Sequence, residues 1–203
     1  MDYCIYIKDP YNTSKSGTRK ILKSEDRQVI SVRGKYRMFK KGDYVVKPNT
    51  GICEIEDIAM MSLTDDDEKE YYVLQPLVDH RSKLYVSVDA DRRRLRMAMN
   101  ASEAADFIEK IAEIAVAKIE NEKLREQSYK NAFLSNEPEE LVAIIKNMHI
   151  RARERFAQGK KTTATDERYF QQAENILYNE LGIALGVTKE EIKVMVSEHI
   201  QYA

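Results

Sequence analysis

The stretch MFKKGDYVVKPNTGICEIEDI, residues 38–58, carries two runs rich in β-branched residues, one on each side of a turn sequence. The turn is Pro48-Asn49-Thr50-Gly51, in which proline presets one backbone angle and glycine supplies a positive one. Two strands joined by so tight a turn begin a small, strongly bent sheet. We therefore expect the residues that follow to complete this sheet or to be attached to it.

More strand-like segments follow before residue 98. Residues 70–77 and 83–88 are rich in β-branched and aromatic side chains, and residues 95–97 add a last short strand. Four or five short strands are too few for a two-sheet sandwich, so residues 38–98 are predicted to form a small β-barrel of the SH3 or Tudor type. Barrels of this size usually bind a partner at an edge strand or groove.

From Asn100 the spacing of apolar residues changes from a strand period to a helix period, which predicts a bundle of four or five helices over residues 99–203. The first helix either continues to Leu134 or breaks at residues 115–121, where the apolar stripe loses phase. Phe156 and Phe170 belong to the stripes expected to face the core. Further helix boundaries are marked by Pro138, Gly159, Thr163 with Asp166, Gly186, and Thr188 with Glu191. The predicted fold class is α+β with two segregated domains.

Residues 1–37 are more basic than acidic and show no sustained hydrophobic period. Three interpretations stay open: a poorly ordered tail, a basic arm that touches phosphates, or a segment upstream of a natural start at Met38.

Composition limits the class of protein. The chain has 203 residues, of which 43% are hydrophobic and 33% charged, and its net charge is -1. We expect a soluble, cytoplasmic monomer without a membrane segment or signal peptide. Cys4 and Cys53 lack metal-site spacing, the acidic run 64–68 lacks calcium-loop spacing, and His149 is isolated. We therefore expect no metal, no cofactor and no enzymatic activity.

Cations outnumber anions on the face expected to be solvent-exposed over residues 146–161. This face carries Lys146, Arg151, Arg153, Arg155, Lys160 and Lys161 against Glu154. A cluster of arginines at residues 92–96 is similar. Each is either a solvated surface or a phosphate-contacting patch, because a local excess of positive charge attracts nucleic acid.

The residues of the opening stretch resemble the N-terminal module of CarD-like (CdnL) transcription regulators and transcription-repair coupling factors. The matching residues are Phe39, Gly42, Asp43, Val45, Val46, Pro48, Gly51, Ile55, Glu56 and Ile58. The segments 125–130, 160–175 and 176–185 resemble the CarD helical domain. The resemblance covers residues 38 to about 200, and no helicase motifs follow the barrel.

This resemblance implies a Tudor-like barrel that binds the β subunit of bacterial RNA polymerase. It also implies a helical domain that contacts promoter DNA at the upstream fork without sequence specificity, modulating open-complex stability. The implied polymerase-binding residues are Met61, Tyr85, Val86 and Ser87. The DNA-binding candidates are Lys130, Arg125, Lys146, Arg151, Arg155, Lys160 and Lys161.

The chain departs from the family pattern at several positions. It has no Trp, and Arg125 stands where well-known members carry the Trp wedge that enters the minor groove. Met61 and Ser87 replace basic residues, and Glu167 replaces a DNA-facing Lys. Polymerase binding is therefore better supported than strong stabilisation of the fork.

Two alternatives are kept. One is an enzyme that uses Asp79, His80 or His149 as acid–base groups, although no nucleophile or paired geometry supports it. The other is a general DNA-binding or scaffold protein that acts through the basic helical face without polymerase.

Overall fold

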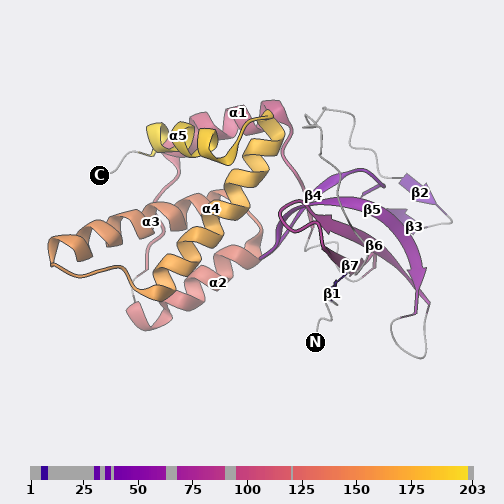
Figure 1. Ribbon diagram of the computed structural model, residues 1–203, viewed down its shortest axis with the longest axis horizontal. Helices are drawn as coiled ribbons and strands as arrows, with labels where there is room; N and C mark the ends of the chain where they lie inside the picture. The colour runs from indigo at the N-terminus through magenta and orange to yellow at the C-terminus, as the bar shows by residue number, and fades with distance from the viewer. Residues whose placement is uncertain are drawn as a thin grey trace. The chain divides into compact units, whose positions relative to one another are not determined.

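The computed structural model describes residues 6–8, 30–32, 35–37, 39–62, 68–89, 95–119 and 121–200. These residues divide into two compact units, one ending at Ala98 and one beginning at Met99. The first contains strands and the second contains helices, so the α+β class is confirmed (Figure 1).

The strand unit is an antiparallel sheet of six strands in the order β1-β7-β6-β5-β4-β8. Its strands are β1 (Tyr6–Lys8), β4 (Tyr44–Lys47), β5 (Gly51–Met61), β6 (Lys69–Pro76), β7 (Ser82–Ser87) and β8 (Arg96–Met97). The order is open among the described residues, with β1 and β8 at its two ends. A register shift between Ile55 and Asp57 lies in the long strand β5, which Figure 1 shows as strongly curved.

The predicted turn joins β4 and β5. The amide of Thr50 donates to the carbonyl of Lys47 at 3.1 Å, and Gly51 has a positive φ of 89°, as expected. Asn49 also has a positive φ of 62°, whereas the sequence predicts a positive φ only at Gly51. Asparagine tolerates this conformation better than most residues, so the turn forms without a second glycine.

Part of the 1–37 segment has regular structure. Strand β1 pairs with residues 82–84 of β7, and β2 (Ile30–Val32) pairs with β3 (Lys35–Arg37) in a separate two-stranded sheet. The acidic run 64–68 and the arginines at 92–94 lie outside the described residues, except for Glu68.

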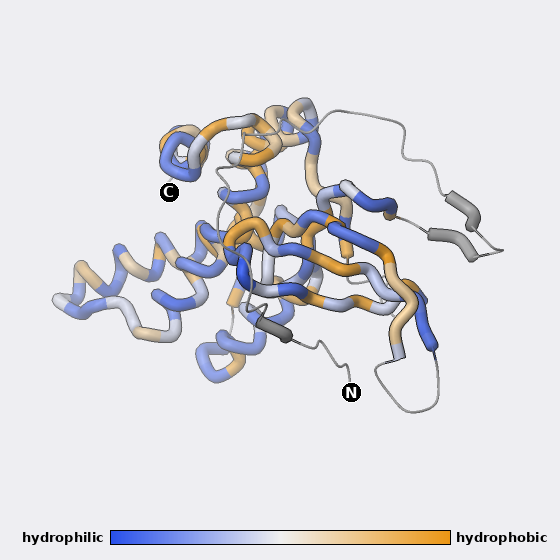
Figure 2. Tube along the Cα trace, turned by 45° about the vertical axis from the view of Figure 1, so that its right-hand side comes forward, coloured by the Kyte–Doolittle hydropathy of each residue, from blue (hydrophilic) through white to orange (hydrophobic). Residues whose placement is uncertain are grey.

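One core holds the strand unit together. Along β7 every second residue is buried, and Figure 2 shows hydrophobic and hydrophilic residues mixed along the strands of the sheet. In this core the Phe39 ring meets the Tyr72 ring edge-on, with 5.7 Å between centroids. The core contains Phe39, Val45, Cys53, Ile55, Tyr72, Leu74, Leu84, Val86, Val88 and Leu95.

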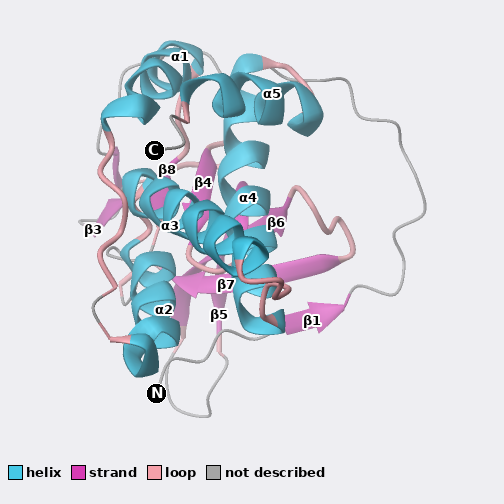
Figure 3. Cartoon of the chain, turned by 90° about the vertical axis from the view of Figure 1, so that its left-hand side faces the viewer, coloured by secondary structure: helices cyan, strands magenta, loops and turns pink. Residues whose placement is uncertain are grey.

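The helical unit contains five α-helices and two 3-10 turns in its described residues. They are α1 (Ala101–Lys110), η1 (Ile111–Glu113), η2 (Glu122–Leu124), α2 (Arg125–Ser135), α3 (Pro138–Ala157), α4 (Ala164–Leu185) and α5 (Lys189–His199). Figure 3 shows α1 and α5 at one end of this unit and α2 and α3 at the other, with α4 running between them. Capping boxes at Asn100 and Thr188 begin α1 and α5, and the one at Thr188 with Glu191 confirms the predicted helix start.

The first helix breaks, so the alternative of a continuous helix to Leu134 is wrong. The carbonyls of Ile111, Ala112 and Ile114, which a longer helix would pair with its own amides, accept hydrogen bonds from the Lys146 ammonium. The irregular segment after them is fixed to α3 at Ala117, whose carbonyl accepts from the Asn147 side-chain amide at 2.9 Å.

Phe156 was predicted to face the core, but 83% of its surface is exposed. The buried stripe of α3 ends at Met148, and the last turn of this helix projects beyond the helices that cover its start (Figure 1). The spacing of Phe156 matches the stripe, but no neighbouring element reaches that far along α3.

Candidate functional site

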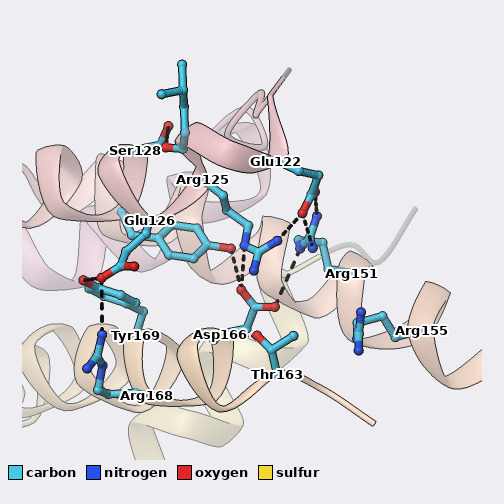
Figure 4. Close-up of polar contacts among 12 residues, drawn as sticks. Glu122, Arg125, Glu126, Ser128, Arg151, Arg155, Thr163, Asp166, Arg168 and Tyr169 are labelled. Carbon is cyan, nitrogen blue, oxygen red and sulfur yellow. Dashed lines mark hydrogen bonds and ion pairs between the residues drawn. The ribbon is translucent and has the colours of Figure 1, made fainter. Parts of the chain in front are cut away.

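Arg125, at the start of α2, and Arg151, in α3, lie side by side. Both contact the carboxylate of Glu122: Arg125 through Nη1, and Arg151 through both terminal nitrogens, with Arg151 Nη2 3.1 Å from Glu122 Oε2. The Arg125 and Arg151 side chains are 16% and 18% exposed, whereas that of Glu122 is 61% exposed. Figure 4 shows the two guanidinium groups between Glu122 on one side and Asp166 on the other.

Asp166 forms ion pairs with both arginines on their buried side. Its Oδ1 lies 3.0 Å from Arg125 Nε, and its Oδ2 lies 4.0 Å from Arg151 Nε. Tyr129, whose side chain is fully buried, donates its hydroxyl to Asp166 Oδ1 at 3.2 Å. Burial, and then the charge of Asp166, raises the pKa of Tyr129 well above its usual value. The tyrosine therefore stays protonated and remains a hydrogen-bond donor.

Local sequence explains why Asp166 lies there. Thr163 caps α4 by accepting the Asp166 amide at 3.1 Å, so Asp166 occupies the first turn of the helix, where an acidic group is favoured. The sequence predicted this capping pair. It did not predict that the carboxylate of Asp166 would turn inward to two arginines.

A second polar cluster surrounds Glu126 on the same side of α2. Its Oε1 lies 3.2 Å from Lys130 Nζ, 3.6 Å from Arg168 Nη2, and accepts the Tyr169 hydroxyl at 3.2 Å. The hydrogen bond from Lys130, and then that from Tyr169, lowers the pKa of Glu126. Arg168 also covers the Tyr169 ring at 4.9 Å from its centroid. Arg168 is a candidate that sequence reasoning missed, since one arginine on a helix gives no pattern.

Lys146 is not on the solvent face, and this placement must be corrected. Only 6% of the residue is exposed, and its Nζ donates to the carbonyls of Ile111 and Ile114 at 2.7 Å each and of Ala112 at 3.2 Å. Burial lowers the pKa of Lys146. Lys146 therefore fixes the end of the first helical segment and presents no charge to a ligand.

The remaining basic candidates lie at the projecting end of α3. Arg155 is half-buried and its Nε donates to the Lys161 carbonyl at 2.8 Å, which orders the loop. Gly159, with a φ of 70°, lets the chain reverse. Lys160 and Lys161 are exposed, and Phe156 lies in the same turn. Glu167, on the first turn of α4, is also exposed and accepts from Gln171 at 2.7 Å.

In the strand unit, the four polymerase-binding candidates divide between the two faces of the sheet. Tyr85 and Ser87 on β7 are half-buried, as is Met61 at the end of β5. Val86 must be corrected: it is 3% exposed and its side chain belongs to the core, because successive residues of a strand point to opposite faces. Of the three candidates on β7, only Tyr85 and Ser87 are therefore available to a partner.

Asp79 and His149, two of the three residues considered for catalysis, have other contacts. Asp79 accepts the Ser82 hydroxyl at 2.5 Å and the Arg81 amide at 3.1 Å, as in a turn. His149 packs edge-on against Phe170 with 4.9 Å between ring centroids, and burial, followed by the charge of Lys193, lowers the pKa of His149. Among the described residues, no group of three potential ligands could hold a metal ion. None of the described helices is long and apolar enough to cross a membrane.

An antiparallel sheet followed by a helical unit is the arrangement that the CarD-like resemblance implies. Residues 39–98 match the family model of the CarD-like/TRCF RID domain, an RNA polymerase-interacting domain whose family contacts the polymerase β subunit. Residues 39–98 are therefore similar to the RID domain of CarD-like proteins and transcription-repair coupling factors, and the match supports a transcription-related role. The match ends at residue 98 and does not include the helical unit. A comparison with curated proteins gave no match.

Proposed function

We propose that the protein is a non-enzymatic transcription regulator that binds the β subunit of RNA polymerase through its strand unit. Its helical unit contacts promoter DNA near the upstream fork and modulates the stability of the open complex. The observation that carries this proposal is the family match, which covers the strand unit from Phe39 to Ala98. We further propose that the bent sheet is the Tudor-like barrel expected from the sequence, and that the protein acts as a monomer.

The DNA-contacting part of the proposal is supported by the exposed cations of the helical unit. Lys130 is on α2 and Arg168 is on α4, and Lys160 and Lys161 lie at the projecting end of α3. Such groups bind the phosphate backbone without reading sequence. Each is exposed, so binding DNA requires no rearrangement of the helical core.

Polymerase binding is tested with Tyr85→Ala in the full chain. We expect the affinity for the isolated polymerase β subunit to fall about tenfold, because tyrosines at the centre of an interface often dominate its binding energy. The measurement is titration calorimetry. Tyr44→Ala is the matched control, since Tyr44 is also half-buried but lies on β4, near the opposite end of the sheet. Equal losses for both variants would contradict a β7 interface.

DNA contact is tested with the double variant Lys160→Ala, Lys161→Ala. We expect weaker binding to a short duplex and a salt dependence shallower by about two in the slope of log K against log salt, because each lost phosphate contact removes about one. The control is Lys110→Ala, Lys193→Ala, which removes two exposed lysines from α1 and α5. An unchanged slope for the first variant would exclude these lysines as phosphate contacts.

The alternative of a general DNA-binding protein predicts tight duplex binding without polymerase. The proposed regulator instead binds duplex weakly alone and binds it better when polymerase is present. Titrating duplex into the wild-type protein, once alone and once with polymerase present, therefore decides between the two functions.

A further inference from the structure

The arginine pair formed by Arg125 and Arg151 has its two ends in different environments. The Nε ends of both side chains point to Asp166, whose side chain is 8% exposed, and the terminal nitrogens point outward to Glu122, whose side chain is 61% exposed (Figure 4). The buried carboxylate is therefore ion-paired with both guanidinium groups, without a hydrogen bond from either Nε, and the exposed carboxylate occupies the ends that face the surface.

The carboxylate of Glu122 contacts both guanidinium groups at once. Its Oε1 accepts from Arg151 Nη1, and its Oε2 accepts from Arg151 Nη2 and from Arg125 Nη1. A phosphate group also presents oxygen pairs to the planar fork of an arginine, and such two-point contacts are among the strongest charged hydrogen bonds. We propose that Arg125 and Arg151 form a phosphate-binding fork, that Glu122 occupies it in the free protein, and that a DNA backbone phosphate replaces the Glu122 carboxylate.

Glu122 lies outside the α-helices of the helical unit. It begins a three-residue 3-10 turn, and the described residues 115–119 before it form no helix or strand. By contrast, Arg125 and Arg151 are each on an α-helix, and Asp166 is in the capped first turn of α4. The fork can therefore keep its geometry while Glu122 moves aside.

The exchange would also be balanced in charge. The hydrogen bond from Arg151 lowers the pKa of Glu122, so this side chain is ionised at neutral pH and one anion replaces another. Net affinity would then depend on the difference between the two anions, so Glu122 would limit binding by weak, isolated phosphates and favour a phosphate held in place by other contacts. This inference rests on the proposed DNA contact of the helical unit.

The test is Glu122→Gln in the full chain, compared with Glu154→Gln, an exposed carboxylate one turn from Arg151 that makes the same change in net charge. We expect E122Q to bind a short duplex about tenfold more tightly than wild type, with a steeper salt dependence, since the fork is then free for phosphate. E154Q should gain less than twofold. Adding Arg151→Ala to E122Q should abolish the gain.

A second measurement tests directly whether the fork binds phosphate. Inorganic phosphate is titrated into E122Q while the Nε–H signals of the arginines are followed by NMR, and we expect two of them to shift. Glu122→Asp keeps the charge but shortens the side chain, so it should fall between wild type and E122Q and serves if E122Q does not fold.

The outcomes separate the two proposals. Arginine shifts with phosphate but no gain in duplex binding would support the fork and count against DNA contact by the helical unit. Equal duplex affinity of E122Q and E154Q, together with no arginine shifts, would overturn the fork whatever the DNA affinity of the wild type.

Discussion

Replacing Asp166 with asparagine should lower the free energy of unfolding by about 3 kcal/mol, because breaking a buried ion pair on one side leaves the opposite charges uncompensated. Asp166 lies against Arg125 and Arg151, and it also accepts the hydroxyl of the buried Tyr129. An asparagine fills the same space but carries no charge. We place the loss at the lower end of the range known for buried pairs, since both arginines remain partly exposed. Urea unfolding of the full chain measures it.

The matched control for this change is Glu167→Gln. Glu167 is the next residue of α4, has the same favourable position near the helix N-terminus, and is exposed. It should lose less than about 0.5 kcal/mol, as is usual for a surface substitution. If D166N and E167Q were equally stable, the buried carboxylate would contribute only through the helix dipole, and the account of the arginine pair would be wrong. D166N should also weaken duplex binding, because the two guanidinium groups lose the buried anion that is paired with them.

Much of the fold follows from local signals in the sequence. The turn between β4 and β5 depends on Pro48 and on the positive φ at Gly51, and the starts of α1 and α5 depend on capping boxes formed within four consecutive residues. Such features are set by neighbours along the chain, so they can be predicted without knowledge of the tertiary structure. The division into a strand part and a helical part follows from the change of hydrophobic period at Asn100.

The polar site could be predicted only in part, because its contacts join distant segments. Arg125 and Arg151 were recognised as cations, but their partners Glu122 and Asp166 come from a 3-10 turn and from another helix. Lys146 shows the same difficulty. On a helical wheel it belongs to a polar face, and only the packing of the preceding segment against α3 turns that position into a buried one.

Val86 illustrates a different error. The strand around it was identified, but neighbouring residues of a strand face opposite sides, so a run of three adjacent candidates could not all contact one partner. The strand period therefore excludes Val86, which is in the core, and keeps Tyr85 and Ser87.

Replacing Lys146 with methionine should destabilise the protein by about 2 to 4 kcal/mol, because the carbonyls of Ala112 and Ile114 lose this donor and the Ile111 carbonyl keeps only the Ile114 amide. Each buried unpaired polar group costs about 1 to 3 kcal/mol. Methionine has a similar length and can occupy the same space, so the loss reports the hydrogen bonds to Ile111, Ala112 and Ile114 rather than a cavity. Water that enters beside the exposed Ala112 should recover part of the cost.

The pH dependence distinguishes this role from simple packing. Burial lowers the pKa of Lys146 in the folded protein below its ordinary value of 10.5. Between the lowered pKa and 10.5 the unfolded chain binds more protons than the folded one, so the contribution of this group to stability rises with pH in that window. The stability of wild type minus that of K146M should therefore increase as the pH approaches 10.5. Lys110→Met, which removes an exposed lysine from the last turn of α1, should show neither the loss nor this pH dependence. A difference between wild type and K146M that stays constant with pH would mean that Lys146 is no more desolvated in the folded protein than in the unfolded chain.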